Sequence, residues 1–557
     1  MVARIRVLFF LIILAWLGII ARLFYWQVDN FPRLYSEAGQ QHLSRQEIPS
    51  SRGKIFSSDG FPLVLSKSVN QLYLEPNRVE DPQKTFDSIN QVVSLDPKTF
   101  FKVAENKKIF WYPLASKIDN ETKEKLIAKE IQGIGFDPQW QRSYPEASMA
   151  AHLLGFVGSD ENGNEKGYFG IEGFYDRELK GISGLRFLET DLFGRHILMG
   201  KQWGKGPKKG RDLHLFLDRA IQSAVEKRLK EGVEKYGASS GSAVVMDPQT
   251  GAVLAMACLP TFDLANFAKE DKTRFPNPII SSTFEPGSVF KPMVMAMAID
   301  LGLVNQNTVC EICTGPVSVG EHTISTWNDK YYPRSTMTEV IQHSDNVGMV
   351  FVAQKLGIKN FTRYLERLGF GDKTGIDLEG ETQPILKKED QWLEIDLATA
   401  GFGQGVAFTP MQIIRGVSAI ANGGSLMIPR VVEKISEGER EIFVEMKKQP
   451  VIKQITAKVV TQMMVNAVEK GEAKWAKPVG YKIAGKTGTA QIPVAGHYDK
   501  EKTIASFVGF APADSPKFAM LVTLREPQTS PWGSETAAPL WFQIAKDIFQ
   551  VLGVPPS

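Results

Sequence analysis

Cysteine and histidine are scarce in this sequence, and their scarcity excludes several kinds of site. The 557 residues include three cysteines, too few for a disulfide framework, and seven histidines that show no metal-ligand spacing. Cys310 and Cys313 share a C-x-x-C spacing, but a four-ligand zinc site would need a second pair. We therefore expect two core thiols or one local disulfide, and we disfavour redox catalysis.

The chain also lacks an excess of charge of either sign. Its 65 Lys and Arg nearly balance its 62 Asp and Glu, which leaves a net charge of +3. Such a balance creates no long-range basic field, so nucleic acid is not an expected partner. A chain of this length can bury several cores, so we expect two or more domains.

Long apolar runs are absent except at the N-terminus. Residues 7–28 are mostly apolar and carry one charge, Arg22, and Arg4 and Arg6 precede them. About 22 such residues are enough to cross a hydrocarbon core of about 30 Å. No small-residue cleavage site follows, so we expect a retained transmembrane anchor over 7–28. The two arginines place residues 1–6 in the cytoplasm and the bulk of the chain outside the membrane.

The remaining sequence divides near a Gly- and Lys-rich stretch at residues 204–213. Residues 29–210 contain many Pro and Gly residues and no catalytic cluster, which predicts a spacer or docking domain. Residues 211–557 carry clearer periodic patterns. We expect helices over 217–237 and 537–553, and strands within 240–260, 504–512 and 517–524. Strands from both ends of this part then meet in one mostly antiparallel sheet with apolar helices packed on it, an α+β fold.

The stretch FEPGSVFKPM places Ser288 three residues before Lys291. Pro292 is tolerated only in the first turn of a helix, so Ser288 belongs near a helix N-terminus, where the dipole favours an alkoxide. The spacing puts Lys291 on the serine's face of the helix, next to the hydroxyl that it would activate. A lysine accepts a proton only when neutral, and burial together with a second cation, for which Lys486 is the candidate, would lower its pKa.

Lys486 lies in an alternating segment, residues 481–493, which predicts a strand. A glycine at position 488 lets a substrate backbone lie alongside this strand, while Thr487 and Thr489 offer hydroxyl groups to a carboxylate.

Ser344 and Asn346 lie between two short helical runs. Two residues apart on a loop, their side chains can point into one cleft, whereas Asp345 would point elsewhere. A Ser–His pair with His343 is disfavoured because adjacent side chains diverge.

Each of these patterns also occurs by chance. Residues 51–54 repeat the Ser-x-x-Lys spacing, and residues 373–375 repeat Lys-Thr-Gly in a turn-like context. Taken alone, Ser288 and Ser344 are ordinary helix or loop caps, and Lys486 is an ordinary solvated strand lysine. Their joint occurrence in matching helix, loop and strand contexts argues against coincidence.

Together, S-x-x-K, S-D-N and K-T-G are the motif set of penicillin-binding proteins and class A β-lactamases. The chain resembles class B penicillin-binding proteins along nearly its whole length, and FEPGSVFKP and the absence of appended C-terminal repeats resemble the division-type, septal member. Four further stretches carry the resemblance: 51–64, 142–158, 170–181 and 403–424. Two stretches depart from the family pattern. Ser57-Ser58-Asp59-Gly60 stands where Asp-Arg-Asn-Gly is usual, and Trp532-Gly533-Ser534 stands where Tyr-Gly-Gly is usual on the last strand.

The resemblance implies a single transmembrane helix, an elongated mixed pedestal domain of the dimerisation type over 29–210, and a transpeptidase domain over 211–557. The latter would have a serine β-lactamase-like fold, a mostly antiparallel sheet with helices on both faces. The implied substrate is a peptidoglycan stem peptide ending in D-Ala-D-Ala, and β-lactam antibiotics would trap the serine. A polytopic glycan polymerase and other division proteins are implied partners, and no metal or organic cofactor is needed.

The same resemblance implies a role for each motif residue. Ser288 would be the nucleophile, Lys291 its base, and Ser344 the proton relay to the leaving amine. Asn346 would hold the substrate amide, and the backbone N–H groups of Ser288 and Thr489 would form the oxyanion hole. The terminal carboxylate would be bound by Lys486, Thr487 and Thr489, alongside Gly488.

Several alternatives remain open at this stage. The chain could be an elongation-type transpeptidase, a membrane-tethered serine β-lactamase, or a non-catalytic penicillin-binding scaffold or sensor. A G-x-S-x-G esterase elbow at residues 237–241 is disfavoured, because an elbow needs a strand before it and a helix after it.

Overall fold

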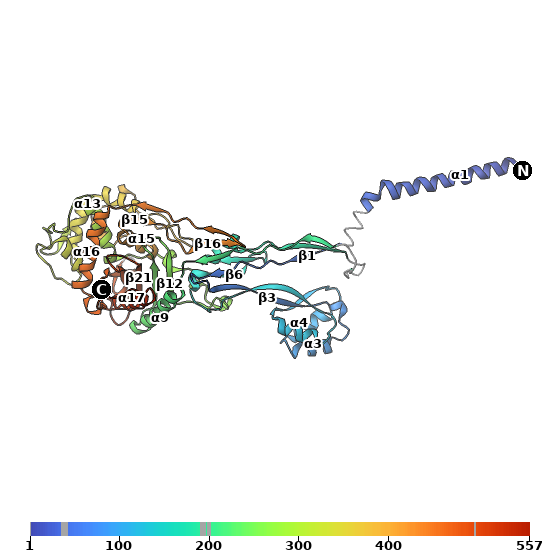
Figure 1. Cartoon of the computed structure of the whole chain (residues 1–557), viewed down its shortest axis with the longest axis horizontal. Helices are drawn as coiled ribbons and strands as arrows, with labels where there is room; N and C mark the ends of the chain where they lie inside the picture. Colours follow the sequence, from blue (N-terminus) through green and yellow to red (C-terminus); the bar gives the residue numbers. More distant parts are fainter. Residues whose placement is uncertain (1, 35–42, 190–196, 198–201, 495–496, 557) are drawn as a thin grey trace. The chain divides into compact units, whose positions relative to one another are not determined.

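The computed structural model describes residues 2–34, 43–189, 197, 202–494 and 497–556 (Figure 1). Their contacts divide the chain into two compact units that are not continuous in sequence. The first unit contains Met1–Arg52, Ser68–Trp140 and Gly181–Gly210, and the second contains Gly53–Lys67, Gln141–Lys180 and Arg211–Ser557.

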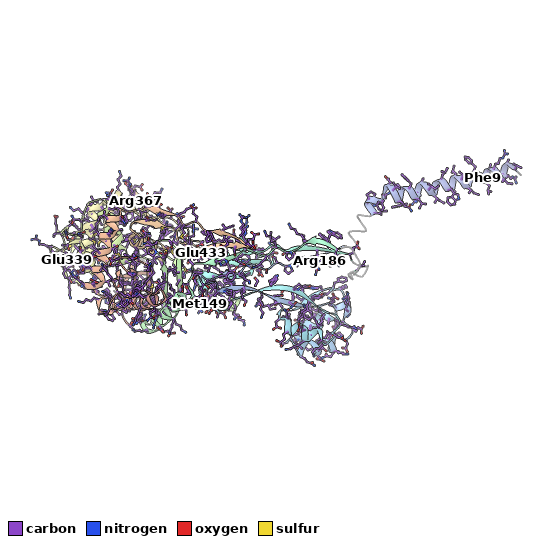
Figure 2. The ribbon with its side chains drawn as sticks, in the orientation of Figure 1. Phe9, Met149, Arg186, Glu339, Arg367 and Glu433 are labelled. Carbon is purple, nitrogen blue, oxygen red and sulfur yellow. A yellow bond between two sulfur atoms is a disulfide. The ribbon has the colours of Figure 1, made fainter. Side chains whose placement is uncertain are left out.

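The N-terminal apolar run forms helix α1 (Val2–Phe24), which continues as one π-helical stretch, η1 (Tyr25–Asp29). None of its residues is buried within the protein, and Figure 2 shows Phe9 projecting from the helix. A helix with apolar side chains on all sides needs an apolar solvent. Val2–Asp29 is long and apolar enough to span a membrane, and no second helix in the described part of the chain passes the same test. Val2–Asp29 is therefore the candidate membrane anchor of the described part of the chain.

The described residues of the first unit contribute strands to two sheets and include several short helices. Strands β1 (Leu43–Ile48), β8 (Gly184–Glu189) and β9 (Gln202–Lys205) form an antiparallel sheet. The distal part of β3 (Pro62–Leu74) pairs with β4 (Tyr112–Ile118) and β5 (Ile134–Ser143). The helices are α3 (Pro82–Asn90), α4 (Pro97–Ala104) and α5 (Asn120–Ile127), each with an aspartate cap at its N-terminus.

The second unit is built on a five-stranded antiparallel sheet in the order β12-β11-β21-β20-β19. Its strands are β11 (Ser240–Met246), β12 (Val253–Leu259), β19 (Ala484–Val494), β20 (His497–Ala511) and β21 (Phe518–Arg525). Strand β11 pairs directly with β21, so strands from both ends of this part of the chain meet. The predicted α+β sheet is confirmed.

Alternate residues of the central strands face two different helical layers. On β11, Ala243 and Val245 pack into the core under α9 (Arg219–Tyr236) and α17 (Ala537–Val551). Val244 and Met246 belong to the core on the opposite face. This period of two is what a strand buried on both faces requires, and helices cover both faces as expected.

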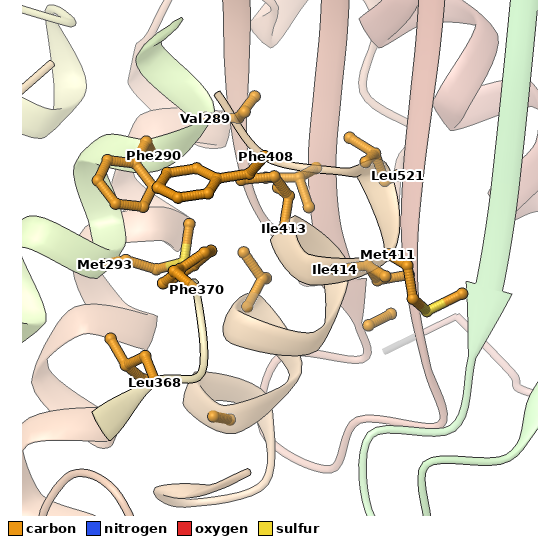
Figure 3. Close-up of a cluster of buried hydrophobic side chains, with 14 of the residues drawn as sticks. Val289, Phe290, Met293, Leu368, Phe370, Phe408, Met411, Ile413, Ile414 and Leu521 are labelled. Atoms are coloured by element: carbon orange, nitrogen blue, oxygen red, sulfur yellow. The ribbon is translucent and has the colours of Figure 1, made fainter. Parts of the chain in front are cut away.

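The second helical layer is formed by the apolar middle of the chain. Its helices are α11 (Lys291–Asp300), α12 (Met337–Gln342), α13 (Asn346–Arg367), α14 (Glu394–Ala400), α15 (Pro410–Ala421) and α16 (Gln454–Lys470). Figure 3 shows the cluster that joins the start of α11 to α15, in which Phe290 and Phe370 both pack on Phe408. All three rings are fully buried, so the turn that carries Ser288 is anchored in the core.

Two features that the sequence left undecided are settled here. Cys310 and Cys313 form a disulfide, the second of the two expected alternatives, while Cys258 is a buried thiol. At the unusual Ser57–Gly60 turn, the Asp59 carboxylate accepts hydrogen bonds from Ser57 and from Arg219, the latter at 3.3 Å. Arg219 also stacks on the Phe61 ring, with the guanidinium carbon 3.7 Å from the ring centroid, so this turn is held without the family's usual residues.

Candidate active site

Ser288 lies in η5 (Gly287–Phe290), a single 3-10 turn that leads directly into α11. Gly287 adopts a left-handed backbone conformation with φ of 56°, and a Cβ atom there would lie 3.2 Å from the Thr489 carbonyl oxygen. Its N–H donates a 3.0 Å hydrogen bond to the Gly403 carbonyl. Pro292 occupies the first turn of α11, as predicted.

Lys291 is fully buried, and its ammonium nitrogen is directed at the turn between α12 and α13. Nζ donates hydrogen bonds to the Ser344 carbonyl oxygen (2.6 Å), to Asn346 Oδ1 (2.8 Å) and to Ser344 Oγ (3.3 Å). Ser344 Oγ in turn donates to Ser288 Oγ over 3.0 Å. Among the described residues, no hydrogen bond joins Lys291 to Ser288 directly. The Ser-x-x-Lys spacing predicts the Lys291 amine directly beside the Ser288 hydroxyl, whereas in the structure the Ser344 hydroxyl connects the two.

The backbone of Ser344 is strained. Its φ is 55°, a left-handed conformation that a non-glycine residue adopts only when the surrounding structure enforces it. Such strain brings the Ser344 hydroxyl between Ser288 and the two lysines. Asn346 is the first residue of α13, and not part of a loop as the sequence suggested.

Asp345 does not line the cleft, in agreement with the expectation that its side chain points elsewhere. Its carboxylate caps α13 by accepting a 2.8 Å hydrogen bond from the Val347 N–H, and the residue is 2% exposed. Burial raises its pKa, while the nearby Lys291 opposes that rise. This capping role had a signal in the sequence, because an aspartate directly before a helix is a common N-cap.

Lys486 lies on β19, the edge strand of the sheet, as its alternating context predicts. Its Nζ donates to Ser344 Oγ (2.9 Å), to the Thr487 carbonyl (3.1 Å) and to Thr487 Oγ1 (3.2 Å). Ser344 Oγ therefore receives hydrogen bonds from both lysines and donates to Ser288, so one hydroxyl connects the three.

Burial governs the protonation of both lysines. Removal from water holds the pKa of Lys291 well below its usual range, and the Lys486 cation lowers it further, while Asp345 and Glu472 oppose the shift. Burial also lowers the pKa of Lys486, to about 8, against the opposing charge of Glu472. Burial and the second cation therefore both favour the neutral form of Lys291.

The serines and lysines of this network lie at a cleft with a volume of about 590 Å³. Six of the residues singled out from the sequence line it: Ser288, Ser344, Asn346, Thr487, Gly488 and Thr489. The two lysines lie behind this lining, each at most 3% exposed. Residues 51–54 and 373–375, which repeat two of the motif spacings, contribute nothing to the cleft wall.

Gly488 has a second reason to be a glycine. A Cβ atom there would lie 2.5 Å from Ser506 Oγ and 2.8 Å from a Val289 methyl carbon, so β19 packs closely on its neighbours at this point. The Thr489 hydroxyl accepts a 2.9 Å hydrogen bond from the Gly533 N–H, which ties the strand to the segment after β21.

Several cleft residues, Trp327 among them, had no recognisable signal in the sequence. Trp327 meets Trp532, which belongs to the stretch that departs from the family pattern, with ring centroids 4.9 Å apart. Trp532 lies between β21 and α17, and not on the last strand. His322 and Glu472 also line the wall. In the part of the chain that the structure describes, no group of three or more His, Cys, Asp or Glu side chains could hold a metal ion.

Comparison with known proteins assigns both parts of the chain to protein families. Residues 241–550 match the family model for the penicillin-binding protein transpeptidase domain, and residues 47–215 match that for the penicillin-binding protein dimerisation domain.

Individual relatives are similar along nearly their whole length. Stage V sporulation protein D of Bacillus subtilis is 32% identical over 99% of this chain and 86% of its own length. The peptidoglycan D,D-transpeptidase FtsI of Escherichia coli K12 is 31% identical over 98% of this chain and 91% of its own. A crystal structure of penicillin-binding protein 3 from Mycobacterium tuberculosis, complexed with aztreonam, has 26% identity and a TM-score of 0.71, covering 92% of this chain and 98% of that one.

Proposed function

This chain belongs to the penicillin-binding proteins that carry a transpeptidase domain, and we propose that it is a serine-type peptidoglycan D,D-transpeptidase. The observation that carries the proposal is the hydrogen-bonded network of Ser288, Ser344, Lys291 and Lys486 at one cleft. We assign catalysis to residues 211–557 and a docking role to residues 29–210.

In the first half-reaction, Ser288 Oγ attacks the carbonyl carbon of the penultimate D-Ala of a stem peptide. An ester forms and the amide bond to the terminal D-Ala breaks. Lys291, kept neutral by burial and by Lys486, takes the serine proton through Ser344. The same path in reverse delivers that proton to the leaving amine, so the half-reaction needs no outside base.

Substrate binding follows from the position of β19 at the sheet edge. A stem peptide can add to this strand as a further strand, with its terminal carboxylate near Lys486, Thr487 and Thr489. Asn346 is in reach of a substrate amide from the opposite wall. The N–H groups of Ser288 and Thr489 would stabilise the oxyanion.

In the second half-reaction an amine of a neighbouring stem peptide attacks the ester, and the product is a cross-link. A β-lactam offers the same serine a strained amide that resembles D-Ala-D-Ala. The resulting acyl-enzyme persists because the amine of the acceptor stem peptide cannot readily attack its ester. The crystal structure of the M. tuberculosis relative in complex with aztreonam, a β-lactam, supports this part of the proposal.

The cellular setting is part of the same proposal. Arg4 and Arg6 at one end of α1 support a cytoplasmic N-terminus, with the catalytic cleft on the outer side of the membrane where peptidoglycan lies. Similarity to FtsI supports a septal role in cell division. We propose a polytopic glycan polymerase and other division proteins as partners.

Labelling of the full-length protein with a fluorescent penicillin tests this function. We expect a stable covalent adduct that Ser288→Ala abolishes and that Ser51→Ala, in the repeated Ser-x-x-Lys spacing, leaves intact. Rapid turnover of the penicillin would support a β-lactamase instead, and a protein that forms no adduct would support a non-catalytic scaffold or sensor. Septal enrichment of a fluorescent fusion would distinguish division from elongation.

A further inference from the structure

Glu472 lies in the wall of the active-site cleft, two residues beyond the end of α16. Among the described residues that line this cleft it is the one carboxylate. Its side chain is partly exposed, and no described residue forms a hydrogen bond or an ion pair with it. None of the proposed catalytic steps uses it.

The position is unfavourable for an anion without a ligand. The C-terminal end of a helix carries partial negative charge, so a carboxylate there is repelled by the macrodipole. Glu469, in the last turn of the same helix, pairs with Lys477 at 3.2 Å, whereas Glu472 has no such partner among the described residues. Its charge opposes the lowering of the pKa of both buried lysines, but it forms no hydrogen bond to either.

The lysines already have their own hydrogen-bond partners. Lys291 is bonded to Ser344 and Asn346, and Lys486 to Ser344 and Thr487. The Glu472 carboxylate is therefore available to a ligand in the cleft, and its charge selects a cation. Hydroxyl, amide and aromatic groups make up most of the remaining wall, so Glu472 is the one described residue of the lining that offers a cation a full negative charge.

The proposed reaction brings one cationic group to this cleft, the amine of the acceptor peptide, which is protonated near neutral pH. We infer that Glu472 binds this ammonium group and so holds the acceptor beside the Ser288 ester. The inference rests on the proposed function. It names an acceptor that enters with a free ammonium group, and it makes Glu472 a specificity-determining residue of the second half-reaction.

The chemistry balances without a further reactant. The bound ammonium loses one proton to solvent, and its nitrogen then attacks the ester carbonyl. The bond between that carbon and Ser288 Oγ breaks as the amide forms, and the second proton of the nitrogen returns to Ser288 Oγ through Ser344. Glu472 raises the occupancy of the amine and takes no part in bond breaking.

Partition of the acyl-enzyme between aminolysis and hydrolysis tests the inference. The full-length protein is acylated with a thioester donor, and aminolysis is measured with D-lysine, whose amines are protonated, and with hydroxylamine, which is neutral near pH 7. We expect Glu472→Gln to lower the ratio of aminolysis to hydrolysis about tenfold for D-lysine, the loss of one charge-assisted contact, and not for hydroxylamine. Glu469→Gln removes one negative charge from the last turn of α16, at a residue that does not line the cleft, and should change neither ratio.

Three other results would overturn the inference. An equal loss with both nucleophiles would mean that Glu472 acts through the lysines. An unchanged D-lysine ratio would mean that the acceptor binds elsewhere. A fall confined to the acylation rate would make Glu472 a residue of the first half-reaction. Penicillin labelling of each variant verifies folding, and a wild-type protein that forms no adduct would refute the proposed function itself, and this inference with it.

Discussion

Lys486 Nζ and Ser344 Oγ lie 2.9 Å apart, although 142 positions separate the two residues in the chain. The contact joins the edge strand of the sheet to the strained turn between α12 and α13. Because Ser344 Oγ also contacts Ser288 Oγ and Lys291 Nζ, a change on β19 reaches the nucleophile through one hydroxyl.

Lys291→Met should separate catalysis from stability. Methionine fills a similar volume without a charge, so a buried amine no longer has to be desolvated. The Ser344 carbonyl and Asn346 Oδ1 lose their donor, and we expect the two effects on the free energy of unfolding to offset each other largely. Acylation by penicillin should fall roughly 10²- to 10⁴-fold, the usual contribution of a general base. Stopped-flow acylation and thermal unfolding measure the two effects, and near-normal acylation would remove Lys291 from the mechanism.

The acylation rate should depend on pH with two limbs of opposite sign. On the acidic side the rate should rise with pH, because Lys291, whose pKa is lowered, becomes neutral and can accept the serine proton. On the basic side it should fall above about pH 8, because Lys486 loses the charge that attracts the substrate carboxylate. Lys486→Gln should move the acidic limb to higher pH, since the second cation that lowers the pKa of Lys291 is gone. A profile that is flat from pH 5 to 10 would contradict this account.

Gly403→Ala should disrupt the nucleophile turn. Gly403 has a φ of 85°, and a Cβ atom there would lie 2.2 Å from the Gly287 carbonyl oxygen, which must then move together with Ser288. We expect penicillin acylation to fall at least tenfold. Gly438→Ala is the matched control, because its φ of 63° carries similar strain with no atom within 4 Å. That control should destabilise by about 1 kcal/mol and leave acylation unchanged. Equal acylation rates in both variants would exclude the collision as the cause.

His152 should make the catalytic unit less stable in mild acid. Burial lowers its pKa to about 4, and its ring lies 2.9 Å from the Arg274 carbonyl oxygen. Below about pH 6.5 the unfolded chain binds a proton that the folded protein does not, so stability falls as pH decreases from about 6.5 to about 4. The loss reaches about 3 kcal/mol at 1.36 kcal/mol for each pKa unit.

Thermal unfolding of the wild type and of His152→Gln across this pH range measures the contribution of His152. The variant should lose this part of the pH dependence, whereas His322→Gln, at an exposed position, should retain it. Parallel pH curves for the wild type and His152→Gln would show that another group is responsible.

Sequence patterns located the strands of the five-stranded sheet and the helices α9 and α17 of the second unit correctly. The helix expected over 217–237 is α9 (Arg219–Tyr236), and the strands expected within 240–260 are β11 and β12. These elements follow from periodicity and from turns such as residues 247–251, between β11 and β12, because local sterics and one-sided burial act over a few residues. The helical span at the N-terminus was predictable for the same reason.

The details of the site were less predictable. The motif order made convergence of Ser288, Ser344 and Lys486 a reasonable hypothesis. The sequence could not predict which side chain forms a hydrogen bond with which. Ser344 stands between Lys291 and Ser288 because its turn adopts a left-handed conformation, which no local pattern encodes. Asp345 and Glu472 affect the lysines through space, from a helix cap and from a helix end.

The amino-acid sequence by itself therefore determined the membrane anchor, the α+β pattern of the catalytic part and the residue types that a lysine-assisted serine nucleophile requires. Only the tertiary structure decided which repeated motif faces the cleft, which hydroxyl joins the lysines to the serine and where an unpaired carboxylate lies. Periodicity reports how each segment buries its own surface, whereas hydrogen bonds and Coulomb interactions depend on distances between segments that packing alone sets.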